Sequence, residues 1–228
     1  MSNFLPANAN MTHGGNMNAK PIVHIVDDDD SFRTSLFRLL RGHDFDVKAY
    51  ASTGDFLLHR PSDRHGCILL DIRLPGPSGI ELHAVLRDQG VYLPVIFITG
   101  HAEVDTCVAA MKAGAVDYLE KPIEPEALLD AIGRALARDG HERACRNERD
   151  ALQSTFSSLS QRERQIFDLI ISGRLNKQIA DDLGIAERTV KAQRASLMEK
   201  LGVNSAAGLG RFAEKIYTHK EKRADHSD

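Results

Sequence analysis

Residues 67–79 read CILLDIRLPGPSG, an apolar run that stops at Asp71 and continues into a loop rich in proline and glycine. A short, continuous apolar run bounded by turn residues is typical of a buried strand in a parallel sheet. Similar runs precede and follow it and alternate with amphipathic stretches. We expect strands at Ile22–Val26, Asp46–Tyr50, Cys67–Leu70, Val95–Thr99 and Asp117–Leu119. This alternation predicts an α/β fold, a five-stranded parallel doubly wound sheet with helices on both faces.

The amphipathic stretches between these strands carry residues that usually begin helices. Asp30 or Ser31 fits the N-terminal cap of the first helix, and Pro125 fits the first turn of the last one. The predicted helices span Phe32–Arg41, Asp55–Arg60, Ile80–Asp88, Val104–Ala113 and Glu126–Arg138. Each pair of successive strands is thus joined by a helix, as parallel strands require.

The C-terminal part of the chain has helical periodicity and no strand pattern. A capping box, Ser160 to Glu163, precedes an apolar helix, and further helices follow near Asn176–Leu183, Glu187–Leu201 and Ser205–Tyr217. Gly184 supplies a turn between two of them. We therefore expect a separate all-α domain of four helices that contains a helix-turn-helix.

The helix predicted at Glu187–Leu201 has two different faces. Val190, Leu197 and Leu201 form an apolar stripe that we expect to be buried. The opposite face carries Arg188, Lys191, Ala192, Ala195 and Glu199. Small side chains allow close approach to base edges, and Lys and Arg reach bases or phosphates, so this face suits a recognition helix. The alternative is an ordinary helical hairpin with a solvated charged face.

Composition limits the classes of function. The 228 residues are 42% hydrophobic, which suits two globular domains, and no apolar run approaches the ~18 residues of a membrane span. We therefore expect no membrane partner. The net charge of −3 is divided unevenly: residues 20–138 hold 13 basic and 18 acidic residues, whereas residues 157–223 hold 13 and 8. A nucleic acid is expected to meet the C-terminal part.

Cysteine and histidine usage points to no metal centre. Cys67, Cys107 and Cys145 lack the spacing of a metal site or a redox pair, which favours a reducing, cytoplasmic location. The ten histidines show no paired-ligand pattern, so none is assigned a metal.

Shifts in composition suggest the boundaries of the domains. Residues 1–19 are expected to be a disordered N-terminal extension, within which Met17 offers an alternative start of translation. We expect a first domain at residues 20–138, a helical or polar linker at 139–157, a helix-turn-helix domain at 158–219 and a flexible tail at 220–228.

Polar groups gather where the predicted strands end. The first strand runs into Asp27-Asp28-Asp29-Asp30, the third ends at Asp71, the fourth at Thr99-Gly100, and the fifth leads to Lys121-Pro122. In an open parallel sheet these carboxyl ends meet at one edge, where functional groups lie. We favour Asp27 and Asp28 as the acidic pair because they directly follow the strand, with Asp28 and Asp29 as the alternative pair.

Such a set of residues suits phosphoryl chemistry. Carboxylates at ~5 Å in a dry pocket repel one another by about 3 kcal/mol a pair at an effective dielectric near ~20, which favours a bound cation. Mg²⁺ prefers carboxylate and carbonyl oxygens, and a lysine at the rim suits a phosphoryl group. We predict that Asp71 is a nucleophile that forms an acyl phosphate. Lys121, the Thr99 hydroxyl and backbone N–H groups near Arg73 and Gly100 would contact the phosphoryl oxygens.

The set VDDD, DIRLPGPSG, ITG and EKP, at these intervals, resembles the receiver domain of two-component response regulators over residues 20–138. The resemblance implies that Asp71 is the phosphoacceptor. It implies an Mg²⁺ site made by Asp27, Asp28, Asp71 and the backbone carbonyl of Arg73. It also implies a switch in which the Thr99 hydroxyl moves toward the phosphoryl group while the ring of Tyr118 rotates inward, with Lys121 beside them.

The segments LSQRERQIF, NKQIA and ERTVKAQRASLMEKL resemble the LuxR/NarL-type effector domain over residues 158–217, and the whole chain resembles the FixJ and StyR group of transcriptional regulators. The resemblance implies that Lys191, Ala192 and Ala195 read bases. It implies phosphate or backbone contacts for Lys177, Arg188, Thr189, Arg194 and Lys200. It also implies that a face of the last helix, made of Leu209, Phe212, Ala213 and Ile216, forms a dimer contact.

Two residues depart from the pattern of this effector domain. Gln193 stands where many relatives have His, so a contact from that position is not carried over. Ala186 stands where a Ser or Thr cap is usual, which weakens the start of that helix by about 1 kcal/mol.

The combined resemblance implies a phosphorylation-switched transcription factor, and the analogy with its group implies an activator. The implied partners are a sensor histidine kinase, double-stranded promoter DNA, RNA polymerase and a second copy of the chain after phosphorylation. It implies no enzyme beyond self-catalysed phosphoryl acceptance and slow autodephosphorylation. One rival is an Mg²⁺-dependent phosphatase similar to haloacid dehalogenases, but that family has DxDxT where Ile72 and Arg73 follow Asp71 here. A second rival is a phosphorylation-independent binding module with a vestigial pocket.

Overall fold

The computed structural model describes residues 20–59, 64–100 and 104–224, and the chain divides after Gly140 into two compact units. The expected N-terminal extension, residues 1–19, lies outside the described residues. Within the described ranges, no helix combines the length and the apolar character needed to cross a membrane. Each unit has an apolar core of its own.

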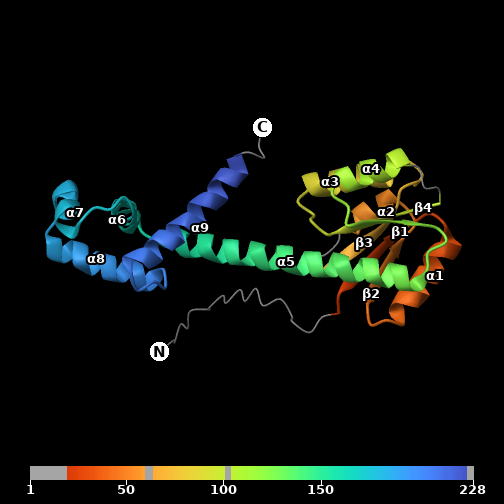
Figure 1. The fold of residues 1–228 in the computed structure, drawn as a ribbon, viewed down its shortest axis with the longest axis horizontal. Helices are drawn as coiled ribbons and strands as arrows, with labels where there is room; N and C mark the ends of the chain where they lie inside the picture. Colours follow the sequence, from red (N-terminus) through yellow and green to blue (C-terminus); the bar gives the residue numbers. More distant parts are fainter. Residues whose placement is uncertain (1–19, 60–63, 101–103, 225–228) are drawn as a thin grey trace, which may run out of the picture. The chain divides into compact units, whose positions relative to one another are not determined.

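The first unit is built on a parallel sheet of five strands in the order β2-β1-β3-β4-β5 (Figure 1). The central strand, β3, is buried at every position, and so are its neighbours β1 and β4. Continuous apolar runs on central strands satisfy burial on both faces, and the predicted α/β class is confirmed. The strands are β1 (Ile22–Val26), β2 (Asp46–Tyr50), β3 (Gly66–Asp71), β4 (Val95–Thr99) and β5 (Asp117–Glu120).

Helices cover both faces of this sheet (Figure 1). On one face, apolar side chains of α1 and α5 form a core with the strands. On the other face, α2, α3 and α4 form a second core. The helices are α1 (Asp30–Arg41), α2 (Thr53–Leu58), α3 (Gly79–Asp88), α4 (Val104–Lys112) and α5 (Pro125–Ser157). The strands thus pack between two apolar cores, which fixes the positions of the residues at the strand ends.

The start of α1 and the end of α5 are the differences from the prediction that matter for the site and for the linker. The cap of α1 is Asp29 and not Asp30 or Ser31, because the Asp29 carboxylate accepts hydrogen bonds from the backbone N–H groups of Ser31 (2.9 Å) and Phe32 (3.1 Å). Helix α5 continues past Arg138 to Ser157, so the segment at 139–157, predicted to be helical or polar, is helical. That stretch contains no proline, and Gly140 alone costs a helix only about 1 kcal/mol.

The second unit consists of the end of α5 and four helices that share one core. Three phenylalanines mark its centre, with ring centroids of Phe156 and Phe167 5.3 Å apart and those of Phe167 and Phe212 6.3 Å apart. The helices are α6 (Gln161–Ile171), α7 (Asn176–Leu183), α8 (Glu187–Lys200) and α9 (Ala206–Ala224). The predicted four-helix domain is confirmed.

The apolar face of α9 packs into this core, so the expectation that it forms a dimer contact is wrong. Its four residues are all buried within the unit, namely Leu209, Phe212, Ala213 and Ile216. A domain of this size has few apolar side chains, and it uses this face to complete its own core. Helix α9 also reaches Ala224, so the first residues of the expected tail at 220–228 are helical.

His24 makes the first unit sensitive to acid. It lies on β1 without exposed surface, its Nδ1 is 3.2 Å from the Tyr50 hydroxyl, and burial, with the charges of Lys48 and Arg64, lowers its pKa to about 4. The unfolded chain takes up this proton near pH 6.5, so the free energy of unfolding falls as the pH drops from 6.5 toward 4. We expect His24→Leu to remove about 2–3 kcal/mol of the difference in stability between pH 7 and pH 4.5, measured by urea unfolding.

The exposed His43 is the control, and an effect of His43→Gln equal to that of His24→Leu would contradict the assignment to the buried imidazole. If His24→Leu kept the wild-type pH dependence, the buried imidazole would not be its cause.

Candidate functional site

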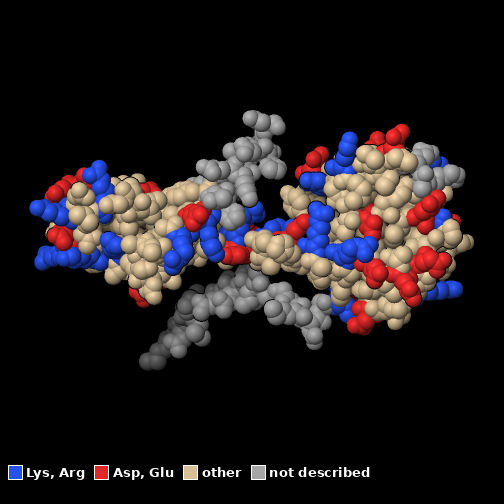
Figure 2. Space-filling view, viewed as in Figure 1, with Lys and Arg blue, Asp and Glu red and all other residues tan. Residues whose placement is uncertain are grey.

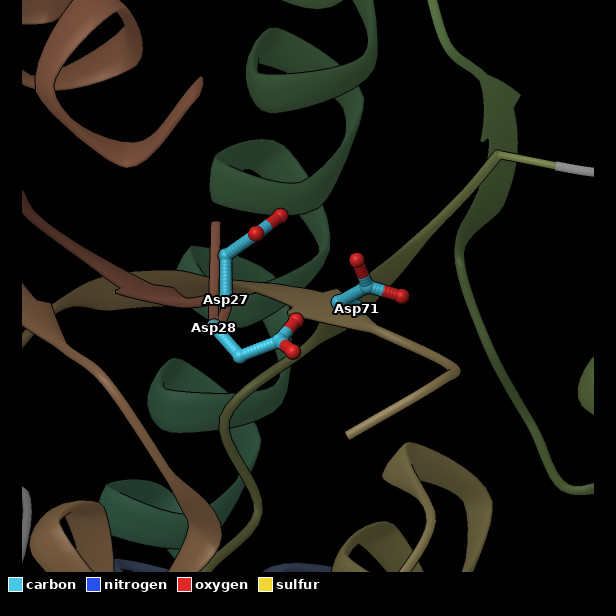
Figure 3. A group of neighbouring side chains, drawn as sticks. All are labelled: Asp27, Asp28 and Asp71. Atoms are coloured by element: carbon cyan, nitrogen blue, oxygen red, sulfur yellow. The ribbon is translucent and has the colours of Figure 1, made fainter. Parts of the chain in front are cut away.

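An acidic cluster lies at the carboxyl edge of the sheet (Figure 3). Asp27 directly follows β1 and Asp71 ends β3, and these two strands are neighbours. One carboxylate oxygen each from Asp27, Asp28 and Asp71 lies within 4.8 Å of the others. Asp27 and Asp71 are buried and Asp28 is exposed, so Asp28 is the member of the cluster that faces solvent.

The four consecutive aspartates at 27–30 have two different roles, because some belong to the acidic cluster and others to the start of helix α1. The Asp29 carboxylate is used as the cap of α1, and its backbone N–H donates to Oδ1 of Asp27 (2.9 Å). Among the described residues, the group that could hold a metal ion contains Asp27 and Asp28 but not Asp29. The structure therefore brings together the pair that the sequence favoured.

Lys121 binds both buried aspartates. Its ammonium donates to Oδ2 of Asp27 (2.7 Å) and to Oδ2 of Asp71 (2.6 Å). Burial works against the charged ammonium, but the two carboxylates outweigh it and hold the pKa of Lys121 above its ordinary value. Burial raises the pKa of Asp27, and the bonds from Lys121 and from the Asp29 N–H offset only part of this effect. Lys121 thus relieves part of the repulsion between the carboxylates.

The loop after β3 fixes the position of Asp71. Arg73 donates its backbone N–H to Oδ1 of Asp71 (2.8 Å), and Gly79 donates its own to the carbonyl of Ile72 (3.0 Å). A Cβ atom at Gly79 would overlap the backbone carbonyl oxygen of Asp71. Only glycine lets the chain return this close to the strand end.

The two predicted switch residues lie on β4 and β5. Thr99 ends β4, is buried, and accepts the backbone N–H of Lys121 at its carbonyl (2.7 Å). Tyr118 pairs with Phe97 and is half-buried against the core on the α2–α4 side. Thr99 is thus brought to the acidic edge, whereas Tyr118 lies within β5.

The donors in the cluster fit a hard divalent cation. Three carboxylates whose oxygens lie within 4.8 Å offer the hard oxygen ligands that Mg²⁺ takes together with water. Asp27, Asp28 and Asp71 would hold such an ion, which would neutralise charge that Lys121 leaves uncompensated. The carbonyl of Arg73 as a further ligand stays a prediction.

Helix α8 exposes the face that the sequence predicts for recognition. Arg188, Lys191, Ala192 and Ala195 are exposed, whereas Val190 and Leu197 are buried on the opposite side. Figure 2 shows Lys and Arg side chains, with some acidic ones between them, over the part of the unit formed by α7 and α8. Lys177 at the start of α7 is exposed as well. Ala186 caps α8 without a side-chain hydrogen bond, as expected.

Some predicted DNA contacts already have partners inside the unit. Lys191 pairs with Glu187 one turn earlier (3.0 Å), and Arg194 donates to Oδ1 of Asn176 (3.1 Å). Arg194 and Thr189 are half-buried. Lys200 has a partner as well, because its ammonium lies 2.8 Å from Oε1 of Glu163, and its DNA contact stays a prediction.

Glu163 joins α8 to the start of α6, and the sequence indicated only half of this role. Its Oε2 accepts the backbone N–H of Ser160 (2.8 Å), which completes the predicted capping box. It also accepts hydrogen bonds from the Ser196 hydroxyl (3.3 Å) and from Lys200 (2.9 Å). The bonds from Lys200 and from Ser160 lower the pKa of Glu163 to about 2. A capping pattern is local, so it carried no signal for a partner on another helix.

Comparisons with known proteins match both units. Residues 23–133 match the response regulator receiver domain, and residues 157–213 match the bacterial regulatory proteins of the luxR family. The chain is 41% identical to Nodulation protein W of Bradyrhizobium diazoefficiens over 89% of this chain and 90% of that protein. It is 42% identical to Transcriptional regulatory protein FixJ of Azorhizobium caulinodans over 84% of this chain and 90% of that protein. The solved structure of response regulator StyR is 48% identical, covers 86% of this chain and all of that chain, and has a TM-score of 0.80.

A receiver fold with an acidic cluster, followed by a LuxR-type helix-turn-helix domain, defines a two-component response regulator that controls transcription. The chain belongs to this family, with FixJ, Nodulation protein W and StyR among its relatives. It is therefore a transcription regulator and not a conventional enzyme.

Gly79 should be needed for the phosphorylation of Asp71 that we propose below. Gly79→Ala places a Cβ where the Asp71 carbonyl lies, so the loop or the strand end must shift. We expect the rate of phosphorylation by acetyl phosphate to fall by about ten-fold or more, because near-attack geometry is lost with shifts of ~1 Å. Gly54→Ala is the control, since a Cβ there meets only the Ser52 hydroxyl at 3.9 Å. Equal rates for the two variants would show that the close approach has no effect.

Glu163 should stabilise the second unit at neutral pH. Glu163→Gln leaves Lys200 without its charged partner and should lower the free energy of unfolding by about 2 kcal/mol at pH 7. Because the pKa of Glu163 is lowered, the stabilisation is fully present above pH 4.5 and is lost as the pH falls toward about 2. The difference between variant and wild type should therefore shrink below pH 4.5, as measured by thermal unfolding. The exposed Glu199 is the control, and an equal effect of Glu199→Gln would contradict the assignment.

Proposed function

We propose that this response regulator accepts a phosphoryl group on Asp71 from a sensor histidine kinase, with Mg²⁺ at the acidic cluster, and that this step switches its binding to promoter DNA. The main support is the geometry of the buried Asp71 carboxylate. One of its oxygens is held by Lys121 (2.6 Å) and the other by the backbone N–H of Arg73 (2.8 Å). A carboxylate fixed in this way needs little reorganisation before it attacks.

The proposed transfer is a simple displacement at phosphorus. A carboxylate oxygen of Asp71 forms the new P–O bond, while the P–N bond to the phosphohistidine of the kinase breaks and its electron pair stays on the imidazole nitrogen. Lys121 and the Thr99 hydroxyl offset charge on the phosphoryl oxygens. Bound Mg²⁺ supplies additional charge neutralisation. Water later hydrolyses the acyl phosphate, and this slow self-dephosphorylation is the sole turnover we propose.

Phosphorylation would favour a dimer through the α4–β5 face of the receiver. Val104, Val108 and Met111 lie on one side of α4 and expose 78%, 45% and 47% of their surface. An apolar stripe of this kind on a helix surface suits a protein partner, and a second copy supplies the same stripe around a two-fold axis. The rearrangement of Thr99 and Tyr118 would alter this face.

The dimer would then bind a two-fold promoter site and act with RNA polymerase in the cytoplasm. Lys191, Ala192 and Ala195 would read bases, and Lys177, Arg188, Thr189 and Arg194 would contact the DNA backbone. Lys200 would add to this mainly by holding α8 against Glu163. In this proposal the receiver spans residues 20–138, the linker 139–157 and the effector domain 158–219.

Transfer from ³²P-acetyl phosphate tests the acceptor. We expect one labelled site in the wild-type protein, no label in Asp71→Asn, and a phosphorylation-dependent dimer on size exclusion only for the wild type. Asp30→Asn is the control, because Asp30 is exposed and lies outside the cluster. Label that persists in Asp71→Asn would assign the acceptor elsewhere. Rapid hydrolysis of a small phosphate ester would favour a phosphatase, and a wild type without label would favour a vestigial pocket.

Lys191 should contribute to sequence recognition. Lys191→Ala should weaken binding to DNA selected by the phosphorylated wild type by about ten-fold, and binding to random DNA by much less. Lys177→Ala should instead weaken binding to both DNAs by similar factors. The slope of the logarithm of affinity against the logarithm of salt concentration should become less steep by about one, as expected when one phosphate contact is lost. Equal losses on both DNAs for Lys191→Ala would make it a phosphate contact.

A further inference from the structure

Asp139 is a buried carboxylate that the proposed function does not use. It lies on α5 within a polar stretch of sequence but has no exposed surface. Its Oδ2 accepts the backbone N–H of Gly66 (3.0 Å) and lies 2.8 Å from Nδ1 of His65. Burial of a carboxylate costs several kcal/mol unless such bonds compensate it. These contacts are therefore what makes the position tolerable in the fold.

The partners of Asp139 lie at the beginning of the strand that ends in Asp71. Gly66 is the first residue of β3, and a Cβ there would overlap the backbone carbonyl oxygen of Ile22. The start of β3 is therefore pressed against β1, while its N–H is bound by α5. A single central strand thus connects the acceptor aspartate at one end to α5 at the other.

Two arginines shortly before Asp139 on α5 bind the segment that connects α4 to β5. Arg134 pairs with Asp117 at the start of β5, and Arg138 donates to the carbonyl of Gly114 (3.4 Å). Together with Asp139, these side chains connect two successive turns of α5 to the start of β3 and to the turn between α4 and β5. A shift of either segment would therefore act on hydrogen bonds or ion pairs made by this part of α5.

Beyond Asp139, helix α5 leaves the receiver. Gly140 is the last residue of the first unit, and residues 140–155 are exposed or half-buried until Phe156 joins the core of the second unit. Glycine weakens a helix interior by about 1 kcal/mol relative to alanine. A Cβ at Gly140 would make only an ordinary contact with Cε1 of His65 at 3.8 Å, so space does not require glycine there. The hydrogen-bonded Asp139 is thus followed directly by Gly140, where the helix is intrinsically less stable.

We propose that Asp139 is a positioning residue that fastens the interdomain helix to the start of β3 and thereby couples phosphorylation of the receiver to DNA binding by the effector domain. The proposal rests on the proposed function, because it concerns how that signal leaves the receiver. Asp139 binds the start of β3, whereas Asp71 ends that strand, so in this proposal Asp139 acts through the position of α5.

The test compares full-length Asp139→Ala with Asp130→Ala, an exposed aspartate on the same helix. Alanine preserves the helix and removes the carboxylate. In the unphosphorylated protein, we expect faster hydrogen exchange at the Gly66 amide and in residues 136–144 for Asp139→Ala only. The ratio of affinities for DNA selected by the wild type, with and without acetyl phosphate, should fall by about five-fold or more, the lower end of usual allosteric couplings. Labelling of Asp71 should remain at the wild-type level, which a general loss of structure would not allow.

A wild-type affinity ratio in folded Asp139→Ala overturns the proposal, whatever the exchange rates show. If Asp139→Ala does not fold, the affinity ratio of His65→Ala decides. This variant removes one partner of Asp139, and the His65 side chain is 40% exposed, so its loss disturbs the core less. A reduced ratio supports the proposal and a wild-type ratio overturns it. If the wild type itself shows no gain in DNA affinity on phosphorylation, the proposed function fails. The anchor is then judged by hydrogen exchange alone, and wild-type exchange in Asp139→Ala overturns it.

Discussion

The structure of the receiver depends on holding two buried carboxylates side by side at the edge of an apolar sheet. Asp27 and Asp71 are brought together because β1 and β3 are neighbours, and their charges would repel strongly in such surroundings. One ammonium, that of Lys121, bridges them, and backbone N–H groups of Asp29 and Arg73 bind the remaining oxygens. The two apolar cores hold the strands that carry these groups, so the geometry of the acidic cluster depends on the whole sheet.

This constraint explains why the sequence predicts the receiver so well. Buried parallel strands need continuous apolar runs, and the residues that end those runs must lie at one edge, so Asp71, Thr99 and Lys121 could be placed before any coordinates. The register of the aspartate run was harder, because four identical residues carry no pattern. Which aspartates join the cluster depends on where α1 begins. Asp29 is the N-terminal cap of that helix and is therefore not a member of the cluster.

The effector domain shows what periodicity leaves open. An apolar stripe predicts that a helix face is buried but not what buries it, and the stripe of α9 proved to be covered by the domain itself. Likewise, the position of a basic residue on a recognition helix suggests a DNA contact but does not show which acidic residues of the same domain it binds. Lys200 is bound by Glu163, which is 37 residues earlier in the chain, and no local pattern reports such a pair.

The end of the receiver follows a different logic from its core. The burial of Asp139 could not be read from a polar stretch, since burial there follows from hydrogen bonds and not from apolar periodicity. An apolar contact tolerates small sliding motions, because its energy varies slowly with displacement. A hydrogen bond from one carboxylate to one backbone N–H weakens steeply once the distance or angle departs from its narrow range. Fastening α5 to β3 in this way makes the path of the helix sensitive to small shifts of the strand that carries Asp71, and a packed sheet is expected to make only small shifts.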